Sequence, residues 1–254
     1  MNGQWQMSTI TPTVTVRAKP RAAANPREAG DGSGNNDAQL EFARGREALR
    51  RAINDYGVVR VPPGSHELHD MRNSGDFYDD KFYIWQFYLR RPLLEPAHLL
   101  FIARCFWSVY KQRYQRQPFQ ISGVEQAAIP ILTAILMTAP SMGVNLHAFT
   151  VRKERKKFGL RNIIEGKPIP ELPCVFVDDL SSPTHATLWH WLRTISEARL
   201  KFYPRAFVVV YKGKRVDLKE IPTTMGNIGL ESIYTLDDFN MTYEEYQANK
   251  VLPR

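Results

Sequence analysis

The residues best suited to chemistry lie in one run, from Pro173 to Ala186. An apolar stretch over 174–177 is followed directly by Asp178 and Asp179, and then by a turn rich in hydroxyl groups. Carboxylates at the end of a buried strand accept hydrogen bonds from neighbouring ribose hydroxyls, and the free N–H groups of a turn that opens a helix hold a phosphate. This order of groups suits a sugar phosphate. The segment leaves a second interpretation open, in which an acidic strand end meets an ordinary Ser/Thr helix cap.

A second run, about twenty residues upstream, is densely basic. A strand-like segment, 149–151, leads into positions 152–161, which hold six Arg or Lys side chains and one Glu. So many like charges repel one another unless an anion binds among them. The pattern therefore favours an anion-binding loop over its alternative, a solvated charged hairpin.

Together the two runs resemble the type I phosphoribosyltransferases, in particular the orotate phosphoribosyltransferases. In that family an Arg-Lys-Glu-x-Lys-x-His-Gly loop and a Leu-Ile-Glu-Gly segment precede a Val-Asp-Asp-Val-x-Thr-x-Gly motif at this spacing. The corresponding positions here are 152–159, 163–166 and 177–184. The resemblance covers residues 66 to 240, and the segment 233–239 is similar to the family's late segment.

The resemblance implies roles for individual residues. Asp178 and Asp179 match the positions that contact ribose and the Mg²⁺ linked to it, so they are the expected catalytic and metal-binding pair. Lys153 and Lys156 match catalytic cations that stabilise a departing pyrophosphate. The expected substrate-binding residues, from the basic run and the 5′-phosphate loop, are Arg152, Ser181, Ser182, Thr184, His185 and Ala186.

Several positions depart from the family pattern. Phe158 replaces a histidine of the basic loop, and Ala127 replaces a lysine in the turn that would hold pyrophosphate. In the same turn Glu125 adds a negative charge, and Ala128 stands where a glycine would let a ligand approach the backbone. Pro183 removes one N–H group from the 5′-phosphate loop. These changes weigh against efficient transfer to orotate.

Two functional hypotheses follow. The first is a phosphoribosyltransferase-like protein that binds phosphoribosyl pyrophosphate or a related nucleotide and, if it is an active transferase, uses Mg²⁺ to transfer or cleave an N-ribosyl group. The alternative is a catalytically divergent effector or regulatory module of the same fold, for example in a bacterial defence system such as a retron, acting through a protein or nucleic-acid partner. The resemblance also implies a homodimer. The residues leave open whether the chain is an enzyme.

Composition and charge narrow the class of protein. The chain has 254 residues, 43% of them hydrophobic, which is enough to bury a sizeable core. It has no uninterrupted apolar window long enough to span a membrane and no secretion signal, so we expect a cytoplasmic protein without a membrane partner. Cys105 and Cys174 each lie in an apolar run, which indicates buried thiols. The net charge of +8 agrees with an anionic ligand.

The elements that must position the two runs follow an α/β pattern. Strands are expected over 56–61, 119–122, 146–151, 174–177 and 206–211. Helices are expected over 37–55, from Pro96 onward, and over 126–138 and 184–198. Apolar strands joined by helical crossovers form a parallel sheet with ligands at its carboxyl edge. We therefore expect the type I phosphoribosyltransferase fold, a central parallel sheet flanked by helices, over residues 39–254, preceded by a flexible extension over 1–38.

Overall fold

The computed structural model describes residues 33–61, 84–154, 162–215, 218, 220–224 and 226–239. Lys156 and Phe158 of the basic run lie outside these residues, as do residues 1–32 of the predicted extension. The first described helix, α1 (Ser33–Ala52), begins before the helix expected from Asp37 and crosses the division proposed at residue 38. That division of the chain stays a prediction.

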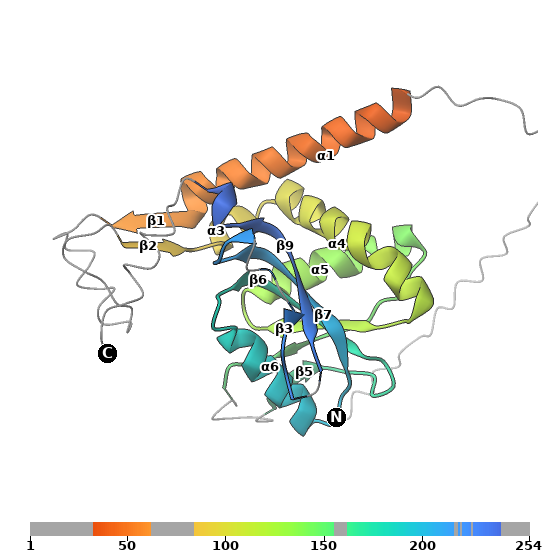
Figure 1. The fold of residues 1–254 in the computed structure, drawn as a ribbon. Coiled ribbons are helices and arrows are strands. Elements are labelled where there is room, and N and C mark those ends of the chain that lie inside the picture. The colour runs from red at the N-terminus through yellow and green to blue at the C-terminus, as the bar shows by residue number, and fades with distance from the viewer. Residues whose placement is uncertain are drawn as a thin grey trace, which may run out of the picture.

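A seven-stranded sheet forms the centre of the molecule (Figure 1). Its strands, in spatial order, are β5 (Ile164–Gly166), β4 (Ala148–Val151), β3 (Gln120–Val124), β6 (Cys174–Ser181), β7 (Phe202–Tyr211), β9 (Ile228–Thr235) and β8 (Glu220–Ile221). The five inner strands are parallel, whereas β5 and β8 pair antiparallel at the two edges. The predicted central parallel sheet is therefore confirmed, with an antiparallel strand added at each edge.

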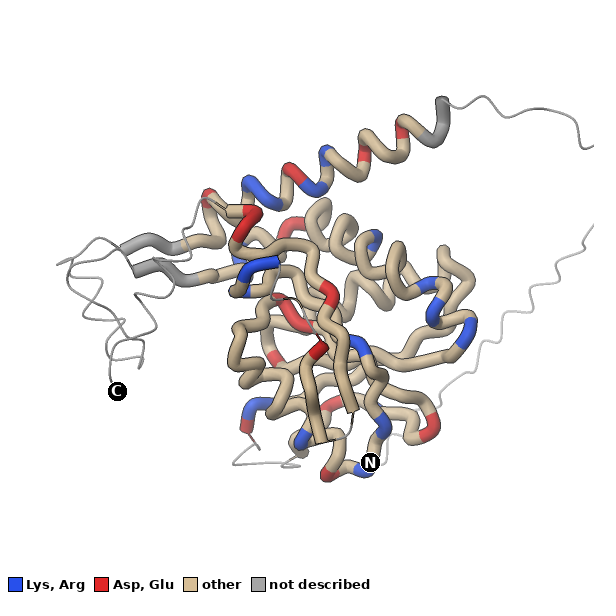
Figure 2. Tube along the Cα trace, in the orientation of Figure 1, with Lys and Arg blue, Asp and Glu red and all other residues tan. Residues whose placement is uncertain are grey.

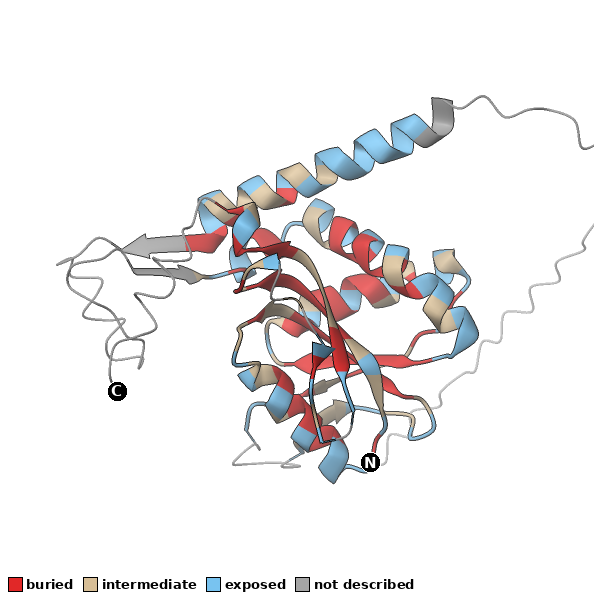
Figure 3. Ribbon diagram, viewed as in Figure 1, coloured by how far each residue is buried: buried red, intermediate tan, exposed pale blue. Residues whose placement is uncertain are grey.

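Helices cover both faces of this sheet, as the alternation of strands and helices predicts (Figure 1). They are α4 (Pro96–Arg116), α5 (Ala128–Thr138) and α6 (Ala186–Glu197). α4 and α5 pack on one face and α6 on the other, and the buried positions gather between these layers (Figure 3). Among the described residues, no helix is long and apolar enough to cross a membrane.

Alternate residues of β6 pack into the cores on opposite faces of the sheet. Val175 and Val177 belong to the core formed with α4 and α5, whereas Cys174 and Phe176 belong to the core formed with α6. Because both faces are covered, β6 reads in the sequence as a continuous apolar run instead of an alternating one. The strand nevertheless continues four residues past that run, so Asp178 and Asp179 lie inside it.

Shorter elements complete the described chain. They are a π-helical turn (Ile53–Gly57), β1 (Val58–Val61), β2 (Ile84–Phe87), α3 (Arg90–Leu93) and the 3₁₀ turns η2 (Pro140–Met142) and η4 (Leu236–Asp238). β1 and β2 pair antiparallel beside the main sheet. The sequence pattern does not predict β2, β5, β8 or β9. β5 and β8 are too short to show a periodicity, and β9 mixes Gly, Glu and Ser with apolar residues.

α1 is attached to α4 by a close helix contact. A Cβ atom on Gly45 would lie 2.7 Å from Cδ2 of Phe101, so a larger residue at this position would require the Phe101 ring to shift. The Phe42 ring lies 5.2 Å from the Phe101 ring, measured between centroids. Residues 36–44 of α1 extend beyond the body, are exposed, and include both acidic and basic residues (Figures 1, 2 and 3).

A charged cluster around Asp238 ties α1 to the end of β9. Arg46 Nη2 lies 3.0 Å from Asp238 Oδ1, and Arg215 Nη2 lies 2.6 Å from Asp238 Oδ2. Asp238 Oδ2 also accepts the N–H of Thr235, which completes a capping box for η4. Tyr234 Oη donates to the carbonyl of Arg46 at 2.5 Å. Segments about 190 residues apart in the chain are therefore joined through one carboxylate.

We predict that Asp238→Ala lowers the free energy of unfolding by roughly 1–3 kcal/mol, because it removes a helix cap and two charge-assisted contacts. Urea denaturation at neutral pH measures the effect. Glu197→Ala is the control, because it removes an exposed pair with Arg193 at 2.9 Å and should change stability by about 0.5 kcal/mol or less. Equal effects of the two substitutions would contradict the proposed role of Asp238.

Candidate functional site

The carboxyl ends of β3 and β6 open on a cavity of about 360 Å³, called here the site cavity. Its walls come from residues 87–90, which run from the end of β2 to the start of α3, and residues 124–127, which run from the end of β3 into the following turn. Lys153 after β4, residues 178–180 of β6 and Thr187 of α6 complete the lining. The cavity therefore lies at the edge of the sheet where the strand pattern places a ligand.

Close packing between β3, β6 and α5 brings the walls of the cavity together. A Cβ atom on Gly123 would lie 2.1 Å from the carbonyl oxygen of Val177 and 2.5 Å from the Cβ of Ala128. Glycine at this position lets the backbone of β6 lie against the start of α5. On the other face, Trp191 Nε1 donates to Ser122 Oγ at 3.1 Å and fixes α6 to β3. The turn after β3 and the aspartates of β6 consequently face one space.

Asp178 and Asp179 form the acidic part of this space. Asp178 is only 4% exposed, and its Oδ1 accepts the backbone N–H of Asp179 at 2.9 Å. Burial, and after it the neighbouring charge of Asp179, raises the pKa of Asp178 well above its usual range, while Lys153 opposes the shift. Burial also raises the pKa of Asp179, and this shift is opposed first by a hydrogen bond with Asp178 and more weakly by Arg90. The pair therefore favours bound protons, cations or hydroxyl donors.

Lys153 and Arg90 bring positive charge to the site cavity from two different segments. Lys153 follows β4 in the basic run, as predicted. Arg90 begins α3 and is missing from the predicted site. The sequence does carry a signal there, two consecutive arginines before a proline at 90–92, but nothing local indicates that this segment covers the carboxyl edge of a distant sheet.

Arg152 is held by two carboxylates. Its Nη1 atom lies 2.9 Å from Glu165 Oε1 and 3.2 Å from Glu125 Oε2. Its carbonyl oxygen lies 2.8 Å from Nε2 of His190 on α6. Glu125 lines the site cavity, whereas Arg152 is not among the lining residues. The side chain predicted to meet a ligand anion is thus already neutralised by the protein.

The predicted 5′-phosphate loop forms one compact turn between β6 and α6. Ser181 Oγ lies 3.1 Å from Nδ1 of His185, and the hydroxyls of Ser182 and Thr184 lie 2.8 Å apart. His185 has a positive φ of 51° and donates its N–H to the carbonyl of Ser182 at 2.9 Å. Ala186 begins α6, whose first N–H groups have no partner within the helix. The turn therefore presents donors at the amino end of α6.

The His185 side chain packs within this turn and helps to set its shape. Its ring stacks on that of Tyr211, with centroids 6.0 Å apart and planes at 8°. Burial lowers the pKa of His185, which favours the neutral imidazole. A neutral ring adds no cation for a phosphate, so its contribution here is the shape of the turn and the hydrogen bond with Ser181.

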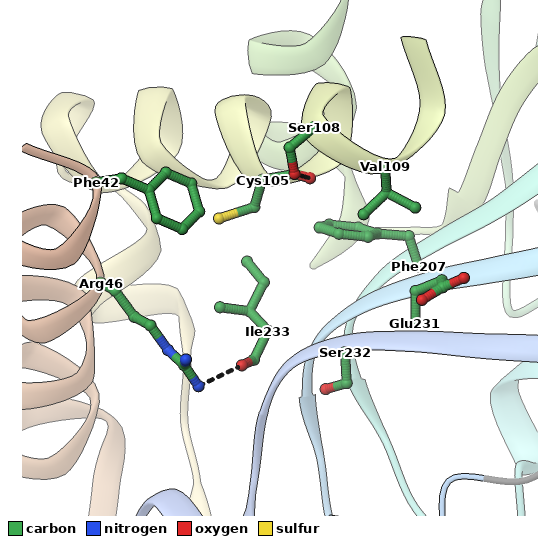
Figure 4. A pocket seen from close by; sticks show the side chains of 9 residues that line it. All are labelled: Phe42, Arg46, Cys105, Ser108, Val109, Phe207, Glu231, Ser232 and Ile233. Atoms are coloured by element: carbon green, nitrogen blue, oxygen red, sulfur yellow. Dashed lines mark hydrogen bonds between the residues drawn. The ribbon is translucent and has the colours of Figure 1, made fainter. Parts of the chain in front are cut away.

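A second cavity, of about 150 Å³, lies between α1, α4 and β9 and shares no lining residue with the site cavity (Figure 4). Its charged groups are already paired. Arg46 donates to the carbonyl of Ile233 at 3.3 Å, and Glu231 pairs with Arg113 at 3.0 Å. Burial raises the pKa of Cys105 to about 12, so its thiol stays protonated. The charged groups of this lining are therefore engaged within the protein.

Comparisons with known proteins agree with this architecture, although no family model matches the chain. Orotate phosphoribosyltransferases from two strains of Tropheryma whipplei, Twist and TW08/27, are each 42% identical to it over 62 residues. The match spans 24% of this chain and 29% of each relative.

Solved structures extend the likeness over most of the chain. A phosphoribosyltransferase from Corynebacterium diphtheriae has a TM-score of 0.51 at 16% identity, over 78% of this chain and 99% of that one. Mycobacterium tuberculosis orotate phosphoribosyltransferase with Fe(III) dicitrate has a TM-score of 0.53 at 20% identity, with the same coverage. The same enzyme with phosphoribosyl pyrophosphate has a TM-score of 0.50 at 19% identity, over 84% and 100%. The predicted resemblance to the type I phosphoribosyltransferases is confirmed, and the fold is theirs.

The burial of Asp178 predicts an unusual dependence of stability on pH. Its pKa is higher in the folded chain than in the unfolded chain, so the folded state binds more protons and loses stability as the pH rises through the folded-state pKa. Asp178→Asn removes this loss and keeps an acceptor for the Asp179 N–H. We expect the variant to exceed the native chain in free energy of unfolding at pH 8.

Urea denaturation between pH 4 and pH 8 measures this difference, which should shrink as the pH falls and the native carboxyl takes up its proton. Asp55→Asn, at an exposed position, is the control and should show no such trend. A variant less stable than the native chain at every pH would show that the charge of Asp178 is compensated in the fold.

Proposed function

We propose that this chain, which has the fold of the type I phosphoribosyltransferases, binds a phosphoribosyl compound in the site cavity. One observation carries the proposal. Asp178 and Asp179 line the cavity where β6 leads, through the turn 182–185, into the amino end of α6. Carboxylates there accept hydrogen bonds from ribose hydroxyls, and the helix end donates to a 5′-phosphate. The Mycobacterium tuberculosis enzyme of this fold, solved with phosphoribosyl pyrophosphate, supports the assignment.

Charge in the cavity suits ribosyl transfer or cleavage. The anomeric carbon of a ribosyl group gains positive charge as its leaving group departs, and the carboxylates of Asp178 and Asp179 stabilise that charge. Lys153 and Arg90 line other walls of the cavity, where their positive charges stabilise a departing anion. Lys156, outside the described residues, keeps the same predicted role. Ser182 and Thr184 supply hydroxyl donors beside the 5′-phosphate position.

The proposal includes Mg²⁺ only in the case that the chain is an active transferase. Among the described residues, no group of three or more His, Cys, Asp or Glu side chains is arranged to hold a metal ion. Mg²⁺ is nevertheless commonly bound by one or two carboxylates together with a substrate phosphate, and Asp178 and Asp179 have the right chemistry for that share. The ion would supply positive charge to the phosphate oxygens.

A non-catalytic module of the same fold is the second hypothesis. The specific observation in its favour is that Arg152 is bound by Glu125 and Glu165 instead of facing the cavity. Such a protein would act through a protein or nucleic-acid partner, as in the defence-system alternative. Mass spectrometry of products after incubation with phosphoribosyl pyrophosphate, Mg²⁺ and nucleobases separates the two hypotheses. Light scattering tests the homodimer that the resemblance implies.

The binding proposal predicts that Asp178→Asn combined with Asp179→Asn weakens the affinity for ribose 5-phosphate at least about tenfold, because two charged acceptors for hydroxyl groups are lost. Isothermal titration calorimetry on the native and variant chains measures it.

The matched control is Asp237→Asn with Asp55→Asn, which changes the net charge equally at two exposed positions away from the cavity. Its affinity should equal that of the native chain. A folded cavity variant that binds ribose 5-phosphate as tightly as the native chain would show that the ligand lies elsewhere.

A further inference from the structure

His190 on α6 contacts the point where the basic run begins. Its Nε2 atom lies 2.8 Å from the carbonyl oxygen of Arg152, the first residue after β4. A carbonyl oxygen can only accept, so Nε2 of His190 carries the proton and donates it. His190 follows Thr187 by three residues, and Thr187 lines the site cavity, so the two side chains project from the same side of α6. The contact therefore joins the part of the cavity formed by α6 to the part formed by the basic run.

The same contact fixes the peptide group that leads into Lys153. The carbonyl of Arg152 and the N–H of Lys153 belong to one planar unit. The preceding peptide group is held as well, because the N–H of Arg152 donates to the carbonyl of Ile163 at 2.8 Å. Lys153 is exposed, so packing does not hold its side chain, and the direction in which that side chain leaves the backbone decides whether it reaches the cavity. This direction depends on the peptide plane that His190 holds.

α6 is placed firmly enough to support this peptide. The next residue, Trp191, is almost fully buried and donates through Nε1 to Ser122 Oγ on β3 at 3.1 Å. The amino end of the helix follows directly from the turn 182–185. Because a helix is a rigid element, the place of this turn and the place of Lys153 are linked through α6.

We propose that His190 is a positioning residue, which acts through the Arg152 carbonyl to hold Lys153 in the site cavity at a fixed spacing from the amino end of α6. In a phosphoribosyl compound, the 5′-phosphate and the leaving group lie at opposite ends of one ribose. His190 therefore sets the spacing between the protein groups that meet those two ends. This inference rests on the proposed function, which assigns the amino end of α6 to the 5′-phosphate and Lys153 to the departing anion.

The test compares ribose 5-phosphate, which has no leaving-group anion, with phosphoribosyl pyrophosphate, which has one. Isothermal titration calorimetry in excess Mg²⁺ measures both affinities. His190→Leu should weaken the binding of phosphoribosyl pyrophosphate about tenfold, because one charged contact is misplaced, and should leave the binding of ribose 5-phosphate unchanged. His190→Gln, whose amide N–H replaces the Nε2 donor, should restore most of the lost affinity. Arg193→Leu, at an exposed position of α6, is the control and should change neither affinity.

A double-mutant cycle tests whether the effect of His190 passes through Lys153. Lys153→Met alone should weaken the binding of phosphoribosyl pyrophosphate about tenfold. Adding His190→Leu to that variant should weaken binding no further, because the side chain that His190 positions is already gone. Additive losses, or equal losses for the two ligands, would overturn the inference and leave the proposed function intact.

A measurement on the free chain separates this inference from the proposed function. Backbone amide NMR relaxation should show residues 152–154 more mobile in His190→Leu than in the native chain, and as well ordered in His190→Gln as in the native chain. Unchanged order in a folded His190→Leu variant would overturn the inference even if both ligands bind. Failure of both ligands to bind the native chain would overturn the proposed function and with it the role of Lys153, whereas the relaxation result would still decide whether His190 holds this peptide.

Discussion

The contact between β3 and β6 sets the geometry on which the rest of the site depends. The carbonyl of Val177 lies so close to Gly123 that a Cβ atom has no room there. This approach draws the turn after β3 toward Asp178 and, through Ala128, sets the start of α5 against the same strand. The core on both faces of β6 then holds the strand rigidly up to its polar end. A carboxyl group carried by such a strand is well positioned and poorly hydrated, which is why its pKa rises.

That arrangement carries a cost in stability that the proposed ligand site would explain. Two adjacent carboxyls with little access to water disfavour the folded state at neutral pH, and the neighbouring cations offset the effect only in part. Proteins keep such groups in binding sites, where polar groups that lack partners in the free protein gain them when the ligand binds. Ligand binding then offsets the loss of folding stability. The position of the pair in a cavity, beside a helix amino end, agrees with this explanation.

Charge in the site is organised differently from the pattern that the family resemblance implies. Glu125 and the lost lysine at Ala127 look like two independent departures in the sequence. In the structure the effect of Glu125 extends beyond its own charge, because it also binds Arg152. Glu125 therefore reduces the positive charge of the site in two ways. Its own carboxylate is negative, and it pairs with Arg152. Among the described residues, the site cavity therefore has fewer available cations than the family resemblance implies.

The sequence by itself determined the parallel α/β core, the strand–turn–helix order around Asp178 and the place of Lys153 beside it. These features depend on residues near one another in the chain, where periodicity and motif spacing are informative. Only the tertiary structure decided that Arg152 is engaged by Glu125 and Glu165, and that Arg90, Phe87 and Tyr88 cover the cavity. Those contacts join segments that are remote in sequence and belong to different elements. Their formation depends on packing across the whole sheet, for which no local pattern provides a signal.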